Sequence, residues 1–251
     1  MCICNNSFSQ LVSIQSEEDK LVKLYAAAIS KIRNYDSVTY YTDKFGNELK
    51  KYITTTPAAL DYPFKKLTDS NYCFVSTSAD GNLRIYSWDT WEGGTMHFFN
   101  QIVQYKSGRR VFTKVPKYEE GDPGTFCSAI YAIKIKGVAY YLPISNGIAS
   151  TKDASQSISV LTINNHELLD TARLFKTKKG LLLNAINMYF DFFSVVDRPK
   201  RPLSLITYDD KEKIIRIPLV NNNGQVTKQR LLYKLQQGYF TFTGIEPDKG
   251  K

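Results

Sequence analysis

The 251-residue sequence lacks the residue patterns on which most cofactor and metal chemistry depends. It has only two histidines and four cysteines and no Cys-x-x-Cys pair, which argues against a zinc or other transition-metal site. Neither the phosphate-binding loop of NTPases nor the glycine fingerprint of dinucleotide-binding folds occurs, and no Gly-x-Ser-x-Gly motif marks a nucleophilic serine. We therefore expect no cofactor and no metal.

Long apolar runs are absent as well. No stretch reaches the roughly 18 residues that a membrane-spanning helix needs, so no membrane span is expected. The first ten residues, MCICNNSFSQ, lack the basic and apolar segments of a complete signal peptide, yet Ser7-Phe8-Ser9 resembles the end of one. Residues 1–15 are interpreted as a signal-peptide remnant of a periplasmic or secreted protein, or else as a disordered tail of a cytoplasmic one.

The charge is strongly basic, with a formal net value of +9. A basic balance favours acidic partner proteins or other polyanions. The lysines and arginines are scattered along the chain, however, whereas nucleic-acid readers gather them on one element. Nucleic acid is therefore not the expected partner.

Aromatic residues are abundant, at 13% of the chain, and Tyr and Phe favour half-buried strands. From residue 71 onward, short strand patterns alternate with turn signals such as Asp80-Gly81, Lys136-Gly137 and Gln237-Gly238. The sequence therefore predicts a mainly β fold, an antiparallel meander of about a dozen strands. A propeller-like arrangement, a twisted sandwich and an open barrel all fit this pattern.

The N-terminal part has helical periodicity. Residues 16–33 carry one apolar stripe, with Ser16 as the expected N-cap, and predict an amphipathic helix that packs on the sheet. The pattern over residues 38–42 predicts a short strand, and that over residues 45–53 predicts a helix. We expect a single β-rich domain over residues 16–245 and a tail over residues 246–251.

One strand holds an aromatic strip. If Leu83–Trp88 alternates, Arg84, Tyr86 and Trp88 share a face, and Trp91 follows close behind. Aromatic faces flanked by charge bind proteins or sugars, but the same residues also fill β cores. The strip is thus either a partner-binding surface or core packing.

Asp89, Glu92 and His97 surround the bend at Gly93-Gly94. A carboxylate beside a histidine can act in general base catalysis, and two carboxylates can serve glycoside hydrolysis. The alternative is that Asp89 caps the turn and that His97 is an ordinary strand residue.

Other candidate residues lie between strands or inside them. Lys152, in a polar loop expected over residues 145–155, and Arg198 belong to loops that often gather at one end of a β fold and bind partners. Cys73 and Cys127 lie in apolar surroundings, where they are either buried thiols or, in an exported protein, one disulfide.

Several phrases resemble uncharacterised secreted β-rich proteins of Bacteroidetes bacteria. They are LRIYSWDTWEGGTMH (Leu83–His97), GDPG (Gly121–Gly124), YYLPISNGIASTKD (Tyr140–Asp153) and DFFSVVDRP (Asp191–Pro199). The resemblance spans about residues 60–242. It implies a compartment and a β-rich domain but no chemistry.

We expect a non-catalytic binding protein of the bacterial cell envelope that holds a protein or glycan partner, with an immunity or inhibitor protein as one version. The alternative is a glycan- or cell-wall-directed hydrolase that uses Asp89, Glu92 and His97. The two hypotheses differ in whether these three residues do chemistry or only support the fold.

Overall fold

The computed structural model describes residues 4–246, with side chains from residue 13 onward. Strands account for 43% and helices for 22%, so the prediction of a mainly β fold is confirmed. The chain divides into two compact units, Met1–Cys127 and Ser128–Lys251, each with its own cluster of buried apolar side chains. The range 16–245, predicted as one domain, spans most of both units.

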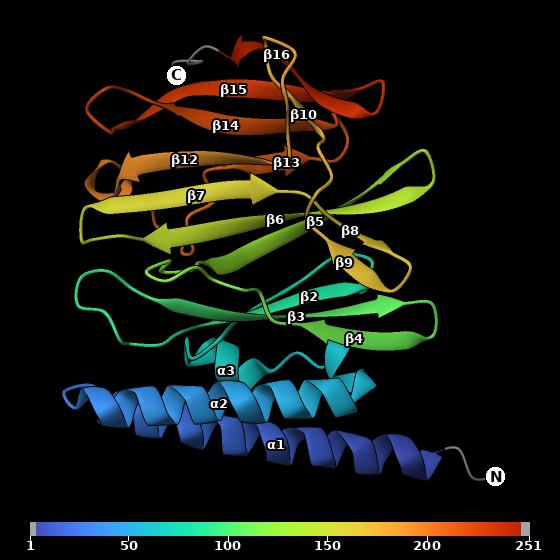
Figure 1. The fold of residues 1–251 in the computed structure, drawn as a ribbon, viewed down its shortest axis with the longest axis vertical. Coiled ribbons are helices and arrows are strands. Elements are labelled where there is room, and N and C mark those ends of the chain that lie inside the picture. Colours follow the sequence, from blue (N-terminus) through green and yellow to red (C-terminus); the bar gives the residue numbers. More distant parts are fainter. Residues whose placement is uncertain (1–3, 247–251) are drawn as a thin grey trace. The chain divides into compact units, whose positions relative to one another are not determined.

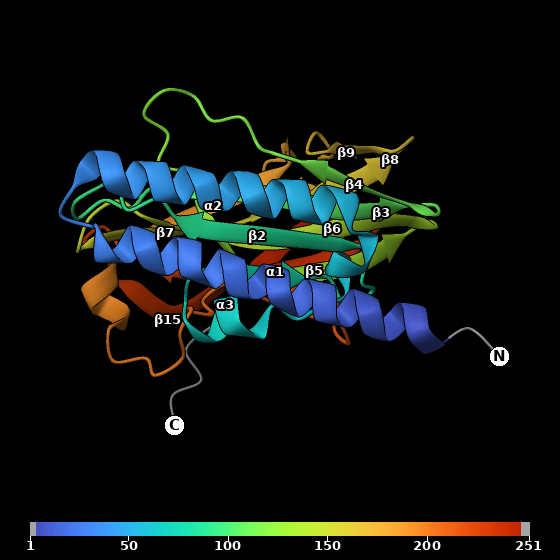
Figure 2. The same ribbon diagram turned by 90° about the horizontal axis from the view of Figure 1, so that it is seen from below.

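The first unit is a helical hairpin packed on a small antiparallel sheet (Figure 1). Its elements are α1 (Cys4–Ser30), α2 (Tyr35–Thr55), the 3-10 helix η1 (Pro57–Leu60), α3 (Lys65–Asp69), β1 (Phe74–Thr77), β2 (Leu83–Asp89), β3 (Phe99–Ser107) and β4 (Arg110–Lys114). The four strands pair in the order of the sequence. Figure 2 shows α1 and α2 side by side along this sheet.

Helix α1 begins well before the predicted start at residue 16. Residues 4–15 are helical, so this part of the expected tail is ordered as helix, and residues 1–3 lie outside the described residues. The apolar stripe extends upstream because Ile14, which is buried, keeps helical spacing with Glu18, Leu21 and Tyr25. Ser16 is therefore an interior residue of the helix, and the predicted N-cap is wrong.

Helix α2 replaces the strand that was predicted over residues 38–42. Its N-cap is Asn34, whose Oδ1 accepts a hydrogen bond from the Ser37 amide at 3.0 Å. Residues at helical spacing then bury one face, namely Val38, Thr42, Phe45, Leu49 and Ile53. The cap and the continuous stripe outweigh the local strand preference of β-branched and aromatic residues.

Strand β2 is buried on both of its faces over Leu83–Trp88. The side chains of Tyr86 and Trp88 pack in the core under the helices, with Phe45 of α2 against Trp88 at 5.5 Å between ring centroids. On the other face, the Ser87 hydroxyl accepts a hydrogen bond from the Cys127 amide at 3.1 Å. The central strand of this unit therefore has no free side on which to present an aromatic surface.

The second unit is built from two six-stranded sheets in the part of the chain that the structure describes. One sheet has the order β12-β7-β6-β8-β9 with β5 paired to β6, and the other the order β11-β10-β16-β15-β14-β13. The strands are β5 (Phe126–Ile135), β6 (Val138–Ile148), β7 (Asp153–Ser159), β8 (Leu161–Asn164), β9 (Glu167–Leu169), β10 (Phe175–Lys176), β11 (Leu182–Leu183), β12 (Ala185–Asp191), β13 (Thr207–Asp209), β14 (Ile214–Val220), β15 (Val226–Gln236) and β16 (Tyr239–Glu246), and β12 leads into the 3-10 helix η2 (Phe192–Val195). The short β10–β16 pair is parallel, which departs from the predicted all-antiparallel meander.

Local turn signals predicted the hairpins well. Gly81, Gly137 and Gly238 all have positive φ, at 68°, 84° and 90°, and each lies at a turn between paired strands. The polar loop expected over residues 145–155 is wrong, because β6 and β7 pair through most of it and leave only a tight turn. Within the described residues, no helix is sufficiently long and apolar to cross a membrane.

Candidate functional site

The catalytic hypothesis requires a carboxylate beside a histidine, and Asp89 and His97 are in contact. Asp89 ends β2, and its Oδ2 makes a short hydrogen bond with Nδ1 of His97. This bond raises the pKa of His97 above its ordinary value, which partial burial only partly offsets. Glu92 forms no hydrogen bond with either side chain in the described part of the chain; its amide donates instead to Thr90 Oγ1 at 3.4 Å. The predicted trio is thus a pair.

The pair belongs to a network that fastens the loop after β2 to helix α1. The second carboxylate oxygen of Asp89 accepts from the Trp91 amide at 2.8 Å. The Trp91 indole donates to the hydroxyl of Tyr25 at 3.1 Å, and that hydroxyl donates to the Asp89 carbonyl at 2.7 Å. Trp91 has a φ of 57°, which is unusual for a bulky residue, and these contacts help to hold it in that conformation.

Hydroxyl groups near the pair are engaged elsewhere. Ser87 is fully buried and accepts from the Cys127 amide, and Thr90 is 3% exposed. Histidine activates a nucleophile only within hydrogen-bond reach. The geometry therefore suits an orienting pair that stabilises the loop better than a nucleophilic site.

The aromatic strip predicted as a binding surface is core. The Arg84 guanidinium donates to the carbonyl oxygens of Ala59, at 2.9 Å, and of Tyr62. The Tyr86 hydroxyl donates to Gln104 Oε1 at 2.9 Å. Arg84, Tyr86 and Trp88 are no more than 5% exposed, and Trp91 is half-buried in the network above. The alternative of core packing is what the structure has, because the helical hairpin covers this face.

Cys73 and Cys127 are not joined by a disulfide. Cys73 belongs to the core cluster beneath the helices, where burial raises the pKa of its thiol to about 12. The backbone of Cys127 is bound from the opposite face of the sheet, since its carbonyl accepts from the Ser76 hydroxyl at 2.9 Å. The sheet lies between the two thiols, so the disulfide alternative is wrong and the buried-thiol alternative holds.

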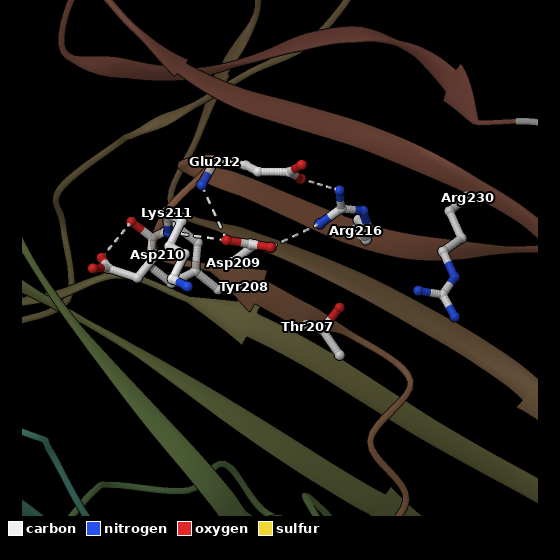
Figure 3. A pocket seen from close by; sticks show the side chains of 8 residues that line it. All are labelled: Thr207, Tyr208, Asp209, Asp210, Lys211, Glu212, Arg216 and Arg230. Carbon is white, nitrogen blue, oxygen red and sulfur yellow. Dashed lines mark hydrogen bonds and ion pairs between the residues drawn. The ribbon is translucent and has the colours of Figure 1, made fainter.

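A wide hollow of about 740 Å³ opens on the outer face of the sheet that contains β13, β14 and β15 (Figure 3). Arg216 at its centre pairs with Asp209 at 3.8 Å, with Glu212, and with Glu246 at 3.5 Å. The Asp210 carboxylate accepts hydrogen bonds from the Tyr208 hydroxyl and from the Lys213 ammonium. Arg230, at the rim, makes no ion pair within residues 4–246. Asp209, Asp210, Glu212 and Arg216 are therefore compensated within the protein, whereas Lys211 and Arg230 make no ion pair with the described side chains.

Lys152 and Arg198 contribute to a second surface, at the end of β12. The Phe192 amide donates to the Lys152 carbonyl at 2.6 Å, and Lys152 Nζ lies 3.7 Å from Asp191. The Arg198 amide donates to the Val195 carbonyl at 3.1 Å, which places Arg198 directly after η2. The tertiary structure therefore brings both predicted loops to this helix.

Two exposed aromatic residues, which the sequence-based prediction missed, complete that surface. Tyr189 is 72% exposed and Phe193 is 59% exposed, with Val196 beside them at 46%. We call the set Tyr189, Phe193, Val196, Lys152, Arg198 and Lys200 the η2 surface. Alternation in β12 gives the signal that could have found Tyr189, because Met188 and Phe190 on either side point into the core.

The positive charge of the chain is concentrated in the second unit. Ser128–Lys251 holds 18 lysines and arginines against 10 acidic residues, a net +8, whereas Met1–Cys127 holds 15 against 14, a net +1. Residues that look scattered in the sequence thus make one strongly basic unit.

Comparison of the chain with protein-family models and with curated proteins finds no match. Among the described residues, no three histidine, cysteine or acidic side chains gather as a metal ion would need. The functional argument therefore depends on geometry and charge alone.

Proposed function

We propose that this chain is a non-catalytic binding protein that holds an acidic protein partner on the η2 surface. The observation that carries the proposal is the exposure of Tyr189 and Phe193, close in the sequence to Arg198 and Lys200, whose charges have no ion-pair partner among the described side chains of residues 13–246. Exposed aromatic side chains in a basic setting are the usual anchors of protein interfaces. The net charge of +8 in this unit favours an acidic partner.

The experiment compares capture by three forms of the full chain. The first is the unmodified chain, the second carries Tyr189→Ser and Phe193→Ser, and the third carries Lys178→Ala and Leu181→Ala as a control on the exposed turn between β10 and β11. Each protein that the first form captures is produced separately and titrated by calorimetry at two salt concentrations. We expect at least tenfold weaker binding by the second form and unchanged binding by the third.

Two results would contradict this proposal. One is a captured protein that binds all three forms equally. The other is binding of heparin or DNA alone, insensitive to Tyr189→Ser and Phe193→Ser and falling steeply with salt, which would indicate a polyanion binder.

We also propose a location in the periplasm or outside the cell, on the basis of the sequence resemblance and the signal-peptide-like residues 7–9, and the narrower role of an immunity or inhibitor protein of the envelope, on the basis of that location and the absence of catalytic motifs. Cell fractionation checks the first, since a chain recovered only from the cytoplasm would exclude it. For the second, the captured partner should be an envelope-acting enzyme that loses activity when the chain binds.

A hydrolase remains the second candidate because Asp89 and His97 are hydrogen bonded. Purified chain is assayed against peptidoglycan and glycan substrates together with Asp89→Asn and His97→Ala. Loss of hydrolysis in both variants at unchanged unfolding midpoints would favour the enzyme. No hydrolysis by the unmodified chain, with lower midpoints in both variants, would favour the structural role.

A further inference from the structure

A smaller hollow lies within the first unit, between helix α2 and strands β2 and β3. Its volume is about 180 Å³, close to that of one small organic molecule. Asp43, Asn47 and Lys50 line it from α2, Asn100 lines it from β3, and Trp88 of β2 forms part of its wall. The hollow belongs to neither the η2 surface nor the Asp89–His97 network.

Four polar side chains around this hollow are not used by the fold, whereas Gln101, which also lines it, donates to the Thr125 carbonyl. Asp43, Asn47, Lys50 and Asn100 make no side-chain hydrogen bond or ion pair with residues 4–246. Four unengaged polar side chains around one hollow are the arrangement of an open binding site.

Trp88 adds a buried donor. The residue is 4% exposed, and its indole Nε1 has no hydrogen-bond acceptor in the described part of the chain. Gly46, which also lines the hollow, lies against the indole edge that carries this nitrogen, because a Cβ there would be 3.4 Å from Cε2. An unsatisfied buried donor destabilises the folded chain. Nε1 is itself inaccessible to solvent, so a ligand oxygen reaches it only when the surrounding side chains move, and that contact then satisfies the donor.

The chemistry of the lining defines the ligand. Trp88 and the Lys50 ammonium only donate, the Asp43 carboxylate only accepts, and the two amides do both. One acid and one base leave no net charge in the lining, so neither an anion nor a cation is favoured. Ile102 and Val115 add apolar wall. A hydroxyl group accepts from Trp88 and donates to Asp43 at once, and a ring that carries several hydroxyls also presents C–H surface to the apolar wall.

We infer that this hollow binds a small neutral polyhydroxylated molecule of monosaccharide size, with the Trp88 indole N–H as a donor to one of its oxygens. Gly46 keeps the site open because a larger residue would push on the indole. This inference is independent of the function proposed for the η2 surface.

The test follows the two indole N–H signals of the full chain by ¹H–¹⁵N NMR. With only Trp88 and Trp91 in the sequence, Trp91→Phe assigns both signals. Glucose, galactose, mannose and N-acetylglucosamine are titrated one at a time, with glutamate and inorganic phosphate as charged comparison probes. We expect at least one sugar to move the Trp88 signal in a saturable way while the Trp91 signal stays in place.

A pair of α2 variants locates the effect. Asn47→Ala removes an exposed lining side chain without disturbing the core and should weaken binding at least fivefold, whereas Lys51→Ala, exposed on the same helix but outside the lining, should bind as the unmodified chain does. The inference is overturned if no sugar moves the Trp88 signal up to 50 mM, if only glutamate or phosphate does, or if both variants bind alike.

Discussion

Gly46 is a residue whose identity depends on one neighbouring side chain. In the middle of α2 a glycine costs about 1 kcal/mol relative to alanine. The compensation is close packing, since a Cβ at this position would lie 2.5 Å from Cζ2 of Trp88. The glycine therefore lowers the helix propensity of α2 but allows the helix to pack closely against β2.

We expect Gly46→Ala to destabilise the chain by about 1–2 kcal/mol, because displacing a buried indole costs more than the alanine gains. Urea unfolding followed by circular dichroism measures the change. Gly94→Ala is the matched control, since a Cβ there would meet nothing within 4 Å, and it should alter the stability by less than about 0.5 kcal/mol. Greater stability of Gly46→Ala would show that the indole moves freely.

His97 gives the stability of the chain a dependence on pH. The bond to Asp89 raises the pKa of His97 in the folded chain above its unfolded value of about 6.5. The contribution is therefore fully present below pH 6.5 and is lost as the pH rises through the folded pKa. Thermal unfolding between pH 5.5 and pH 8.5 should show the stability advantage over His97→Gln shrinking as the pH rises.

Asp89→Asn supplies the control for this effect. Without the carboxylate only burial acts on the pKa of His97, and burial lowers it, so the stability advantage of Asp89→Asn over the double variant with His97→Gln should no longer shrink as the pH rises but should grow. An advantage that still shrinks with rising pH in the absence of Asp89 would mean that another group causes the pH dependence.

At the scale of the element, α2 depends on a single cap. Asn34 accepts from the Ser37 amide, and three residues of turn separate it from α1. Asn34→Ala should cost about 1 kcal/mol of unfolding free energy, whereas Asn34→Ser keeps a capping oxygen and should cost only a few tenths. Chemical denaturation of both variants checks this; equal loss in the two would indicate that packing alone starts the helix.

Helix α3 has its cap in another helix. Glu18 of α1 is 1% exposed, and its Oε1 accepts from the amides of Lys66 at 2.7 Å and Leu67 at 3.2 Å. Its Oε2 accepts from the Tyr62 hydroxyl at 2.6 Å. A buried carboxylate with three donors stabilises the first turn of α3, whose orphan amides it satisfies.

Removing this carboxylate should be among the most damaging single changes in the first unit. Glu18→Ala leaves one buried and two part-buried donors without their acceptor and should cost about 2–3 kcal/mol. Glu17→Ala, one residue earlier and on the solvent side, should cost less than about 1 kcal/mol. Thermal unfolding of both variants gives the comparison, and similar losses would contradict the capping role.

For the whole molecule, the separation of the two central cysteines has a direct consequence. Cys73 and Cys127 lie on opposite faces of one sheet and share no disulfide. A reducing agent should therefore leave the thermal midpoint unchanged within about 1 °C, as measured by calorimetry in its presence and absence. A fall of several degrees would mean that a disulfide forms in solution.

The charge distribution is also a property of the whole chain. The net charge is +8 in Ser128–Lys251 and +1 in Met1–Cys127. Such a charge difference affects association with partners and does not determine the fold. It directs the search for a partner to the second unit, where the exposed aromatic side chains of the η2 surface lie.

Local sequence patterns were sufficient to predict the fold class and most hairpins. Aromatic and β-branched alternation predicts strands, and turns such as Lys136-Gly137 require the positive φ that glycine accepts. These features are local, so a few neighbouring residues suffice. The prediction of a strand over residues 38–42 was wrong because it used only five residues. Their strand propensity is outweighed by a helical apolar stripe that continues as far as Ile53.

The chemistry that is available to the side chains depended on tertiary packing. The sequence left Arg84, Tyr86 and Trp88 as either a binding face or core packing, and the helical hairpin that covers them makes them core. Glu18 of α1 caps α3, which lies far along the chain. Whether a side chain lies on the surface or in the core depends on what packs over it. That partner comes from residues far along the chain, and periodicity within one strand carries no information about it.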